Sequence, residues 1–481
     1  MKAEKKRARG GAAAAAWLLV PLLVLVVIKT DCLPQVTRSY PSSATLKAAI
    51  GLTKATDGPS LNSDWVSEAV QSPISSDEIA GDGVDAIKDV AAPRSKLRCN
   101  FSSVRMNICA LEGDVRMHGK SATVYLVAPS DGTYRPENGT VTIRPYARKW
   151  EMSTMESIRA VTIRSSGTDT APPRCTITHD VPVVVFSTGG FSPNYFHAMG
   201  DIIIPLYITA REYDGNVMLA ATDYDHKWIF KYRHIFAALS VYPVIDFDTD
   251  DAVRCFPSAH VGIESHDDLG IKPALSRNGY TMKDFQSFLR SVYSLKRVSV
   301  APAKRSLGQR PCLVMLIRRN SRALTNDVEA IAVATEIGFD VVAAEPEMAR
   351  DMPQFAKVVN TCDVIIGVHG AGLTNMLFLP HNGTVMQIIP WGNIHQNCWY
   401  LFGRPVPGMG LRYVEYEATA EETTLKDVYP RDHAVFTDPG SIGKESFDDM
   451  WKIFFNGQNV TVDIDRFRGV MQQIYQSVTI A

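Results

Sequence analysis

Four short apolar runs alternate with helix-like segments in the C-terminal half of the chain, and this alternation restricts the fold more than any other feature. The runs lie at residues 312–317, 339–344, 364–368 and 384–389. They carry no regular polar alternation, which is typical of strands buried on both faces of a parallel sheet. The helical patterns that separate them lie at residues 326–337, 347–360 and 371–379. The pattern therefore predicts a doubly wound α/β half with right-handed crossovers.

The first and third runs end in residues suited to binding an anion. Arg318 and Arg322 follow the first run, and arginine matches phosphate oxygens with two N–H groups. The turn after the third run consists of His369, Gly370, Ala371 and Gly372. It leads into a predicted helix, whose first backbone N–H groups have no intrahelical partner. Because parallel strands end at one edge of a sheet, we expect these two strand ends to form a diphosphate cradle.

Three further residues at the same edge are candidate ligands of a nucleotide. Asn326 opens the helical pattern that follows the arginines, and Glu345 could accept hydrogen bonds from ribose hydroxyls. Trp391 could supply a stacking face for a base. Either Glu345 or Trp391 could equally have a structural role and no contact with a nucleotide. Arg319, between the two candidate arginines, is expected to be a solvated surface residue.

A second set of candidate residues follows an apolar run at residues 181–186. Asn194, His197 and Asp201 are spaced so that one face of a helix carries all three. A carboxylate beside a histidine can act as a general base, or can orient the histidine so that it does. His197 and Asp201 are therefore candidate catalytic residues, with Asn194 as an orienting group. The structural alternative is a helix N-cap with a hydrogen-bonded histidine.

The N-terminus predicts a membrane anchor. Basic residues within 1–11 precede an apolar run at 12–28, and no small-x-small cleavage site follows it. Positive charge before a single span predicts a cytosolic tail and a lumenal remainder. Residues 29–95 are rich in Pro, Ser and Asp and predict a largely disordered stem. A cleaved signal peptide is the competing interpretation.

The rest of the chain is long enough for two domains. Strand-like and helical patterns predict one domain at residues 96–305 and a nucleotide-binding domain at residues 306–445. The last segment, residues 446–481, predicts two helices. A formal net charge of −1 gives no support to a nucleic-acid binder.

Cysteines and glycosylation sequons agree with a lumenal location. The chain has eight cysteines and no Cys-x-x-Cys pair, which disfavours a zinc site. Cys99 and Cys109 flank a short segment and could form a disulfide in an oxidising lumen. Asn-x-Ser/Thr sequons occur at Asn100, Asn138, Asn382 and Asn459.

Several of these motifs together resemble plant glycosyltransferase family 61, from about Cys99 to the C-terminus. The motifs are Asn194-x-x-His197-x-x-x-Asp201, Arg318-x-x-x-Arg322-x-x-x-Asn326, Gly367-Val-His-Gly-Ala-Gly-Leu-Thr-Asn375 and Pro390-Trp-Gly392. The resemblance implies a GT-B-like α/β architecture of two Rossmann-like doubly wound domains, with residues 446–481 crossing back to the first domain. It also implies an inverting reaction, a UDP-pentose donor and a Golgi membrane location. The branch it most resembles decorates xylan.

On this resemblance, the expected function is transfer of a pentose from a UDP-sugar to xylan, with β-1,2-xylosyl transfer favoured over α-1,3-arabinofuranosyl transfer. A catalytically inactive, membrane-tethered carbohydrate-binding protein is the alternative from another class. Asp223-x-Asp225 superficially matches the manganese motif of GT-A transferases, but the same pattern recurs at Asp246 and Asp248. We therefore expect no metal or other cofactor.

Overall fold

The computed structural model describes residues 95–127, 139–166, 171–300 and 308–480. The predicted cytosolic tail, transmembrane helix and stem lie outside these residues, as does Asn138. Within the described ranges, no helix is both long enough and apolar enough to cross a membrane.

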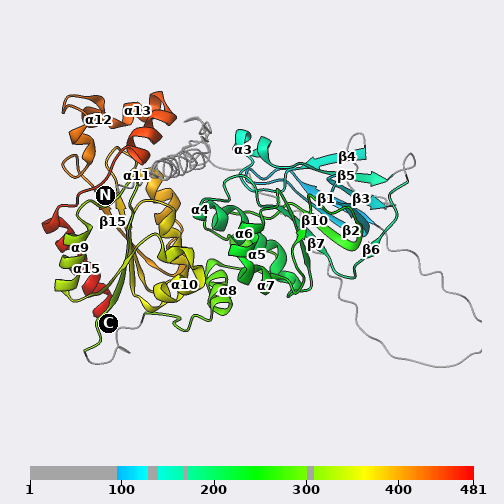
Figure 1. The fold of residues 1–481 in the computed structure, drawn as a ribbon, viewed down its shortest axis with the longest axis horizontal. Helices are drawn as coiled ribbons and strands as arrows, with labels where there is room; N and C mark the ends of the chain where they lie inside the picture. The colour runs from blue at the N-terminus through cyan, green and yellow to red at the C-terminus, as the bar shows by residue number, and fades with distance from the viewer. Residues whose placement is uncertain (1–94, 128–138, 167–170, 301–307, 481) are drawn as a thin grey trace, which may run out of the picture. The chain divides into compact units, whose positions relative to one another are not determined.

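A ten-stranded mixed sheet forms the N-terminal half (Figure 1). Its main path runs β4-β5-β3-β2-β10-β7-β8-β9, with β1 beside β2 and β6 beside β10. The strands are β1 (Lys96–Asn100), β2 (Ile108–His118), β3 (Thr123–Val127), β4 (Thr140–Ile143), β5 (Val161–Ser166), β6 (Ile177–Thr178), β7 (Val183–Ser187), β8 (Met218–Thr222), β9 (Ile245–Asp246) and β10 (Val253–Val261).

Only part of this sheet matches the predicted doubly wound domain. The strands β10, β7, β8 and β9 are parallel, whereas β2 is antiparallel to its neighbours β1, β3 and β10. The difference follows from burial. Every residue of β7 and β8 is buried, but β2 alternates between buried and more exposed positions. Such alternation is typical of antiparallel strands with one solvated face.

The helices of this half lie at α3 (Met152–Ser157), α4 (Tyr195–His197), η2 (Ala198–Ile203), α5 (Ile204–Ala210), η3 (Arg211–Tyr213), α6 (His226–Lys231), α7 (Arg233–Leu239), η4 (Pro273–Leu275) and α8 (Met282–Tyr293). The elements α4, η2 and α5 follow one another without a break, and η2 is a π-helical turn. Turns of this kind are frequent at functional sites.

The C-terminal half contains the predicted parallel sheet. Its five strands are β11 (Cys312–Leu316), β12 (Asp340–Ala344), β13 (Val364–Val368), β14 (Thr384–Ile389) and β15 (Arg412–Glu417). They pair in the order β12-β11-β13-β14-β15, and all are parallel. The four predicted apolar runs are thus confirmed as strands. The edge strand β15 has a polar sequence and was not predicted.

Helices cover both faces of the five-stranded sheet. The helices of this half are α9 (Asp327–Ile337), η6 (Met348–Arg350), α10 (Met352–Thr361), η7 (Ala371–Phe378), α11 (His395–Cys398), η8 (Trp399–Gly403), η9 (Pro407–Met409), η10 (Thr424–Asp427), α12 (Ala434–Thr437), α13 (Pro439–Glu445), α14 (Phe447–Met450), η11 (Trp451–Asn456) and α15 (Ile464–Thr479). One face packs against α9 and α15, and the other packs against α10 and η7. The predicted helix at 371–379 is a 3₁₀-helix.

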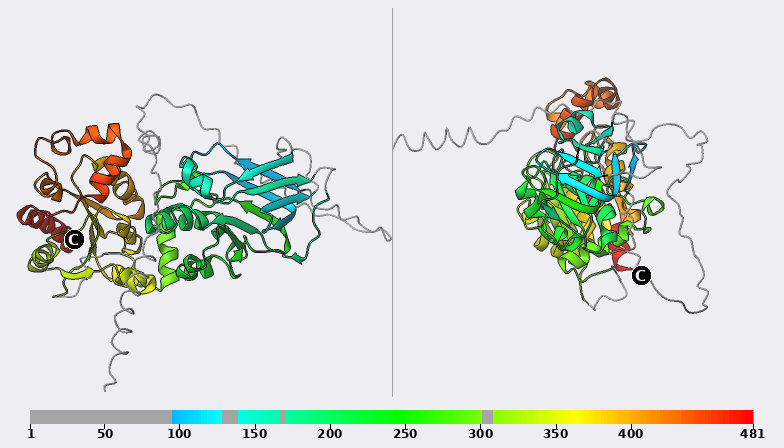
Figure 2. Two further views of the ribbon diagram at one scale, coloured as in Figure 1. Left: turned by 45° about the horizontal axis from the view of Figure 1, so that its top comes forward. Right: turned by 90° about the vertical axis from the view of Figure 1, so that its right-hand side faces the viewer.

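The last helix does not cross back to the N-terminal half. Figures 1 and 2 show α15, in red, beside α9. Tyr475 of α15 packs edge-on against Phe339, with the ring centroids 5.2 Å apart. Arg468 forms an ion pair with Glu336 of α9. The apolar face of α15 covers one face of its own sheet, which explains why it stays there.

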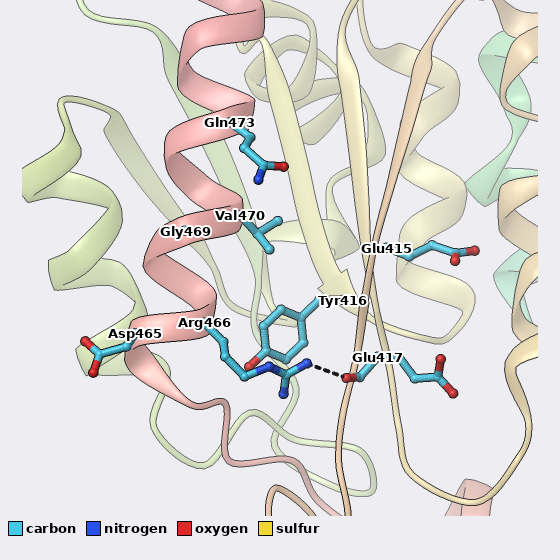
Figure 3. Close-up of a pocket in the computed structure, with 8 residues that line it drawn as sticks. All are labelled: Glu415, Tyr416, Glu417, Asp465, Arg466, Gly469, Val470 and Gln473. Carbon is cyan, nitrogen blue, oxygen red and sulfur yellow. Dashed lines mark hydrogen bonds between the residues drawn. The ribbon is translucent and has the colours of Figure 1, made fainter.

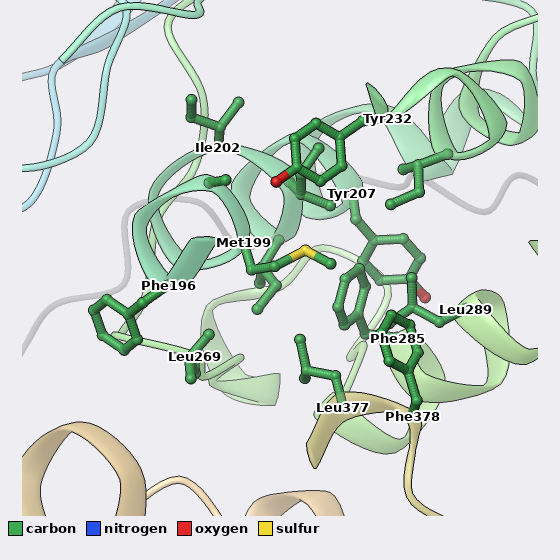
Figure 4. Close-up of a cluster of buried hydrophobic side chains, with 14 of the residues drawn as sticks. Phe196, Met199, Ile202, Tyr207, Tyr232, Leu269, Phe285, Leu289, Leu377 and Phe378 are labelled. Carbon is green, nitrogen blue, oxygen red and sulfur yellow. The ribbon is translucent and has the colours of Figure 1, made fainter. Parts of the chain in front are cut away.

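A single apolar cluster connects the two halves. Phe196 and Met199 of the α4–η2 segment and Phe285 of α8 belong to the same buried cluster as Leu377 and Phe378 of η7 (Figure 4). The face of the C-terminal sheet that carries α10 and η7 therefore packs toward the N-terminal half. This shared core holds the ends of α4 and η7 close to one another.

Within the described residues, three disulfides join strands or their flanks. Cys99 and Cys109 face each other across β1 and β2, and they form the predicted bond. The other two bonds are Cys175–Cys255 and Cys312–Cys362. The Cys312–Cys362 bond joins the starts of the neighbouring strands β11 and β13 and helps to fix their register.

Candidate active site

The first part of the site is the carboxyl edge of the C-terminal sheet, between β11 and β13. β11 pairs with β12 on one side and with β13 on the other. The chain leaves β11 through α9 on one face of the sheet and leaves β13 through η7 on the other face, which opens a crevice between these two strand ends. Arg318 follows β11 and His369 follows β13 at this crevice.

Arg318 and Gly370 are in direct contact. Gly370 has a φ of 152°, and a Cβ at this position would lie 2.5 Å from Nη1 of Arg318. Glycine is favoured here, because residues with a side chain rarely adopt this φ and a Cβ would force the guanidinium to shift. The Nε of Arg318 donates to the carbonyl oxygen of Ser321 at 2.9 Å, which fixes the side chain. The two predicted strand ends therefore meet, and their role in binding a diphosphate stays a prediction.

Arg318 and Arg322 have no ion pair to a carboxylate within the described residues. The Nε of Arg322 is buried without a hydrogen-bond partner, and its guanidinium lies 5.5 Å from the centre of the Phe455 ring. Burial, followed by the charge of Arg318, lowers the pKa of Arg322 to about 10. Two half-buried cations that repel each other would be stabilised by a bound anion.

Arg319 provides the contrast within the same loop. Its Nε donates to Glu345 at 3.0 Å, and its Nη1 donates to Asp327 at 2.8 Å. Its charge is therefore neutralised within the protein, as expected for a surface residue. Among the three arginines of this loop, Arg319 thus has carboxylate partners within the described residues, whereas Arg318 and Arg322 do not.

His369 is a buried, neutral hydrogen-bond donor beside the two arginines. Its Nδ1 accepts from Nε2 of Gln387 at 2.9 Å, and Oε1 of Gln387 accepts from the Tyr413 hydroxyl at 3.0 Å. Burial, then the charges of Arg322 and Arg318, hold the pKa of His369 well below its ordinary value. The proton of the neutral ring therefore lies on Nε2, which suits donation to a phosphate or sugar oxygen.

The other three predicted nucleotide ligands have structural partners. The Asn326 side chain donates to the carbonyl of Val462 at 2.9 Å and accepts from its N–H at 3.1 Å. Glu345 is paired with Arg319. The Trp391 indole donates to the carbonyl of Val435 at 2.9 Å. The amide of Asn326 and the carboxylate of Glu345 thus have partners within the protein. The indole N–H bond of Trp391 does not occupy its ring face, and nucleotide binding by all three residues stays a prediction.

The second part of the site lies on the α4–η2 segment of the N-terminal half. Asn194 caps α4, because its Oδ1 accepts from the N–H of Phe196 at 3.0 Å. His197 is the last residue of α4, and its Nδ1 lies 2.7 Å from Oδ2 of Asp201. The predicted helical face is therefore present, and Asn194 acts as the cap that the structural alternative anticipated.

Asp201 is the centre of a buried ionic network. Its carboxylate is fully buried, and besides His197 its Oδ2 accepts from Arg148 at 2.6 Å and from Tyr146 at 3.1 Å. Arg148 also donates to Asp268 at 3.3 Å. The sequence analysis missed Arg148, Tyr146 and Asp268, since no local spacing connects them to Asp201.

Arg148 is held in an unusual backbone conformation. Its φ is 88°, which is rare for a residue with a side chain. Its side chain is almost fully buried, and Arg105 donates at 2.7 Å to the same oxygen of Asp268. Strain of this kind clusters at functional sites.

The network separates the roles of His197 and Asp201. The cations and hydrogen bonds around Asp201 hold its pKa far below the ordinary range despite its burial. Such a weak base has no access to a substrate hydroxyl. Burial, then the charge of Arg148, lowers the pKa of His197, so the ring is neutral at neutral pH. With its Nδ1 proton held by Asp201, the Nε2 lone pair of His197 is free to accept a proton.

Aromatic contacts connect the two parts of the site. The His197 ring lies 5.2 Å from Phe196, and Phe196 lies 5.3 Å from Phe402, measured between ring centroids. Phe402 lies 5.4 Å from His369. A substrate between the two histidines would thus face the neutral base of one half and the cationic edge of the other.

Comparison with known proteins agrees with this arrangement. Residues 195–386 match the profile of the family Glycosyltransferase 61. Over 79% of its length, the chain is 32% identical to the xylan glycosyltransferase MUCI21 of Arabidopsis thaliana, and the match covers 79% of that protein. The chain belongs to glycosyltransferase family 61.

Two rice relatives in this family are named for different activities. The chain is 40% identical to the β-1,2-xylosyltransferase XYXT1 of Oryza sativa subsp. japonica over 80% of its own length and 84% of that protein. It is 41% identical to the α-1,3-arabinosyltransferase XAT3 of the same organism. That match covers 78% of this chain and 64% of XAT3.

The family profile spans both parts of the candidate site. Its matched range, 195–386, includes His197 and Asp201 as well as Arg318 and the His369–Gly372 turn. Trp391, Arg148 and Tyr146 lie outside it.

The aspartates of the Asp-x-Asp patterns in this family 61 chain already accept hydrogen bonds from other groups of the protein. Asp223 accepts from the Arg159 N–H and the Ser187 hydroxyl, and Asp225 caps α6. Asp248 is paired with Arg159. No cluster of three potential metal-ligating side chains occurs in the described part of the chain.

The described sequons differ in accessibility. Asn382 is exposed, whereas Asn100 and Asn459 are half-buried. The Oδ1 of Asn459 accepts from the N–H of Ala323 at 2.9 Å, which ties it to the loop that carries Arg322. Of the three, Asn382 is the best placed for a glycan.

A further hollow of about 300 Å³ lies between α15 and β15 (Figure 3). Tyr416 and Val470 point into it, and Arg466 donates to the carbonyl oxygen of Glu417 at 3.1 Å. The carboxylates of Glu415 and Glu417 point away from α15. None of the candidate donor or base residues lines it.

Proposed function

We propose that this protein is an inverting glycosyltransferase that transfers a pentose from a UDP-sugar to xylan. The observation that carries the proposal is a pair of arginines, Arg318 and Arg322, at the switch point of a parallel sheet beside Gly370. Neither has a carboxylate partner among the residues that the structure describes. Family membership and the activities for which XYXT1, XAT3 and MUCI21 are named support the reaction class and the acceptor. We further propose that the two sheet domains function as a GT-B-like pair.

The donor diphosphate binds at the end of β11 and β13. Arg318 and Arg322 neutralise its charge, and the first N–H groups of η7, at Ala371 and Gly372, supply backbone donors. Negative charge grows on the leaving phosphate as the sugar–phosphate bond breaks. Fixed cations and dipoles stabilise that charge where it develops. The Nε2–H of His369 adds a neutral donor.

His197 is the general base. Its Nε2 takes the proton of the acceptor hydroxyl while the oxygen attacks the anomeric carbon of the donor. The bond electrons pass to the departing UDP, and attack from the face opposite the phosphate inverts the anomeric configuration. Asp201 does not touch the substrate, and it holds the imidazole in the productive tautomer.

The donor sugar is tested directly. The full-length protein is incubated with UDP-xylose or UDP-arabinofuranose and xylan oligomers, and the product linkage is determined by NMR. We expect β-1,2-xylosyl transfer, with α-1,3-arabinofuranosyl transfer as the second candidate because XAT3 is named an α-1,3-arabinosyltransferase. UDP binding without transfer from either donor would contradict the proposal.

We also propose metal-independent chemistry, because two guanidinium groups can meet the diphosphate charge. Transfer should continue in the presence of EDTA, and loss of activity that Mn²⁺ restores would contradict this.

The proposed location is the Golgi lumen, with a type II anchor at residues 12–28. Three disulfides and the exposed Asn382 sequon support an oxidising compartment. A mobility shift of the wild type on PNGase F treatment, reduced in Asn382→Gln, would test it. An unshifted wild type would contradict the location.

A further inference from the structure

A groove on the N-terminal half, outside the candidate active site, has an aromatic floor and a polar rim. It encloses about 760 Å³ between α5, α7 and α8. Its aromatic residues are Tyr207, Tyr280 and Phe288. The polar residues along it are Arg211, Asp214, His234, Asp284, Ser287 and Ser291.

The aromatic rings form a continuous surface. The centroid of the Tyr207 ring lies 5.5 Å from Tyr280 and 5.1 Å from Phe288. Phe285 packs behind them, 5.1 Å from Tyr207. Tyr280 and Phe288 are half-buried, so each keeps part of its ring accessible. Rings held by such mutual contacts present a flat apolar surface at little entropic cost.

The charges along the groove are already paired or engaged. Arg211 donates to Asp214 at 3.0 Å, and Asp284 accepts from the N–H and hydroxyl of Thr281 in the capping box of α8. An anionic nucleotide would find no free cation at these positions. A neutral polymer with C–H faces and many hydroxyls matches an aromatic floor with hydroxyl and imidazole groups beside it.

The groove and the proposed base share one helical segment. His197 and Tyr207 both lie on the continuous run α4–η2–α5. At a rise of about 1.5 Å per residue, they are separated by about 15 Å along the axis. A polymer is long enough to contact both places, whereas a short oligosaccharide at His197 leaves the groove empty.

We propose that this groove is a second binding site for the acceptor polysaccharide, a neutral chain of β-linked pentoses. The proposal rests on the proposed function for the identity of the polymer. The groove retains the polysaccharide near the enzyme while one of its residues is modified at His197.

Binding is measured by affinity electrophoresis of the full-length protein in gels containing soluble xylan. Phe288→Leu removes the aromatic face and keeps apolar bulk, and Ser291→Trp fills the groove from an exposed rim position. Phe230→Ala is the matched control, because Phe230 is 58% exposed on α6 and does not line the groove. We expect both groove variants to bind xylan about three- to tenfold more weakly, and the control to bind like the wild type.

Activity distinguishes this site from the transfer site. Both groove variants should lose kcat/KM on polymeric xylan and keep the wild-type value on a short xylo-oligosaccharide. Unchanged xylan binding, or equal losses on both acceptors, would overturn the proposal. A shift in oligomeric state caused by Ser291→Trp would instead assign the groove to a second copy of the chain and would also overturn it. If the wild type binds xylan at the groove but transfers no pentose, the result supports the groove as a xylan-binding site and contradicts the proposed function.

Discussion

At the scale of single residues, burial assigns roles that spacing leaves open. His197 and Asp201 are equally good candidates for the base when only their spacing is known. In the structure Asp201 is fully buried and accepts from Arg148, Tyr146 and His197. No described residue bonds to the other ring nitrogen of His197. The carboxylate is therefore an orienting group.

This assignment predicts different effects for two substitutions. His197→Ala should lower kcat by about 10²–10⁴, the usual contribution of a general base. Asp201→Asn keeps a side chain that can bond to the imidazole, so it should lower kcat less. UDP affinity, measured by calorimetry, should be unchanged in both. Full activity in His197→Ala with none in Asp201→Asn would return the base to the carboxylate.

The charges around His197 predict a pH dependence. The imidazole must be neutral to act, so activity is lost as pH falls through its lowered pKa. Arg148 lowers that pKa and Asp268 raises it, together with Asp201. Arg148→Gln should therefore move the acidic limb of the kcat profile to higher pH, and Asp268→Asn should move it to lower pH.

If the Arg148–Asp268 network had only a structural role, the two substitutions would not shift the acidic limb of the kcat profile in opposite directions. Both substitutions break a buried ion pair and are expected to lower stability by about 3–5 kcal/mol, which thermal unfolding measures. Shifts in the same direction, in variants that remain folded, would show that Arg148 and Asp268 do not set the charge state of His197.

At the scale of secondary-structure elements, the β13–η7 turn depends on one glycine. Gly370→Ala would place a methyl group against the Arg318 guanidinium at a φ that disfavours side chains. The free energy of unfolding should fall by about 1–3 kcal/mol, the usual cost of such strain, and UDP should bind more weakly because the guanidinium must shift. Gly372→Ala is the matched control in the same turn, because its Cβ would meet only Leu316 at an ordinary 3.6 Å. Equal UDP affinity in the two variants would contradict the close contact.

The elements also show what the sequence could predict. Continuous apolar runs made β11 to β14 and the candidate anion-binding edge recognisable, and β13 and β14 are buried along their whole length. The edge strand β12 is mostly not buried, which its apolar run did not indicate. β15 and β2 carry polar residues and gave no such signal. The Arg148–Asp201 network joins residues far apart in sequence, and the bonds of Asn326 and Trp391 depend on where residues 435–462 pack. Tertiary contacts of this kind have no local pattern.

At the scale of the whole molecule, one turn connects the two halves of the site. Asp268 binds Arg148 beneath the base, while its neighbour Asp267 forms an ion pair with Arg404 of the C-terminal half. Arg404 follows η8, whose Phe402 contacts both Phe196 and His369. The ion pair therefore holds the base side against the donor side.

A double-mutant cycle tests this link. Asp267→Asn and Arg404→Gln should each lower kcat and leave UDP affinity unchanged, because the donor edge stays intact. Their effects should be coupled by about 0.5–3 kcal/mol, as for residues in direct contact. Additive effects would show that the pair makes no contribution to the alignment of the halves.

The most direct test of the donor site is the affinity for UDP, measured by isothermal titration calorimetry on Arg318→Ala, Arg322→Ala and Arg319→Ala. The first two should each lose about 1.5–3 kcal/mol of binding free energy, as expected for a charge-assisted bond to phosphate. Arg319→Ala should bind UDP like the wild type, because that guanidinium is already paired with Glu345 and Asp327. Unchanged affinity in Arg318→Ala and Arg322→Ala, or an equal loss in all three, would contradict the central claim that the carboxyl edge of β11 and β13 holds the donor diphosphate.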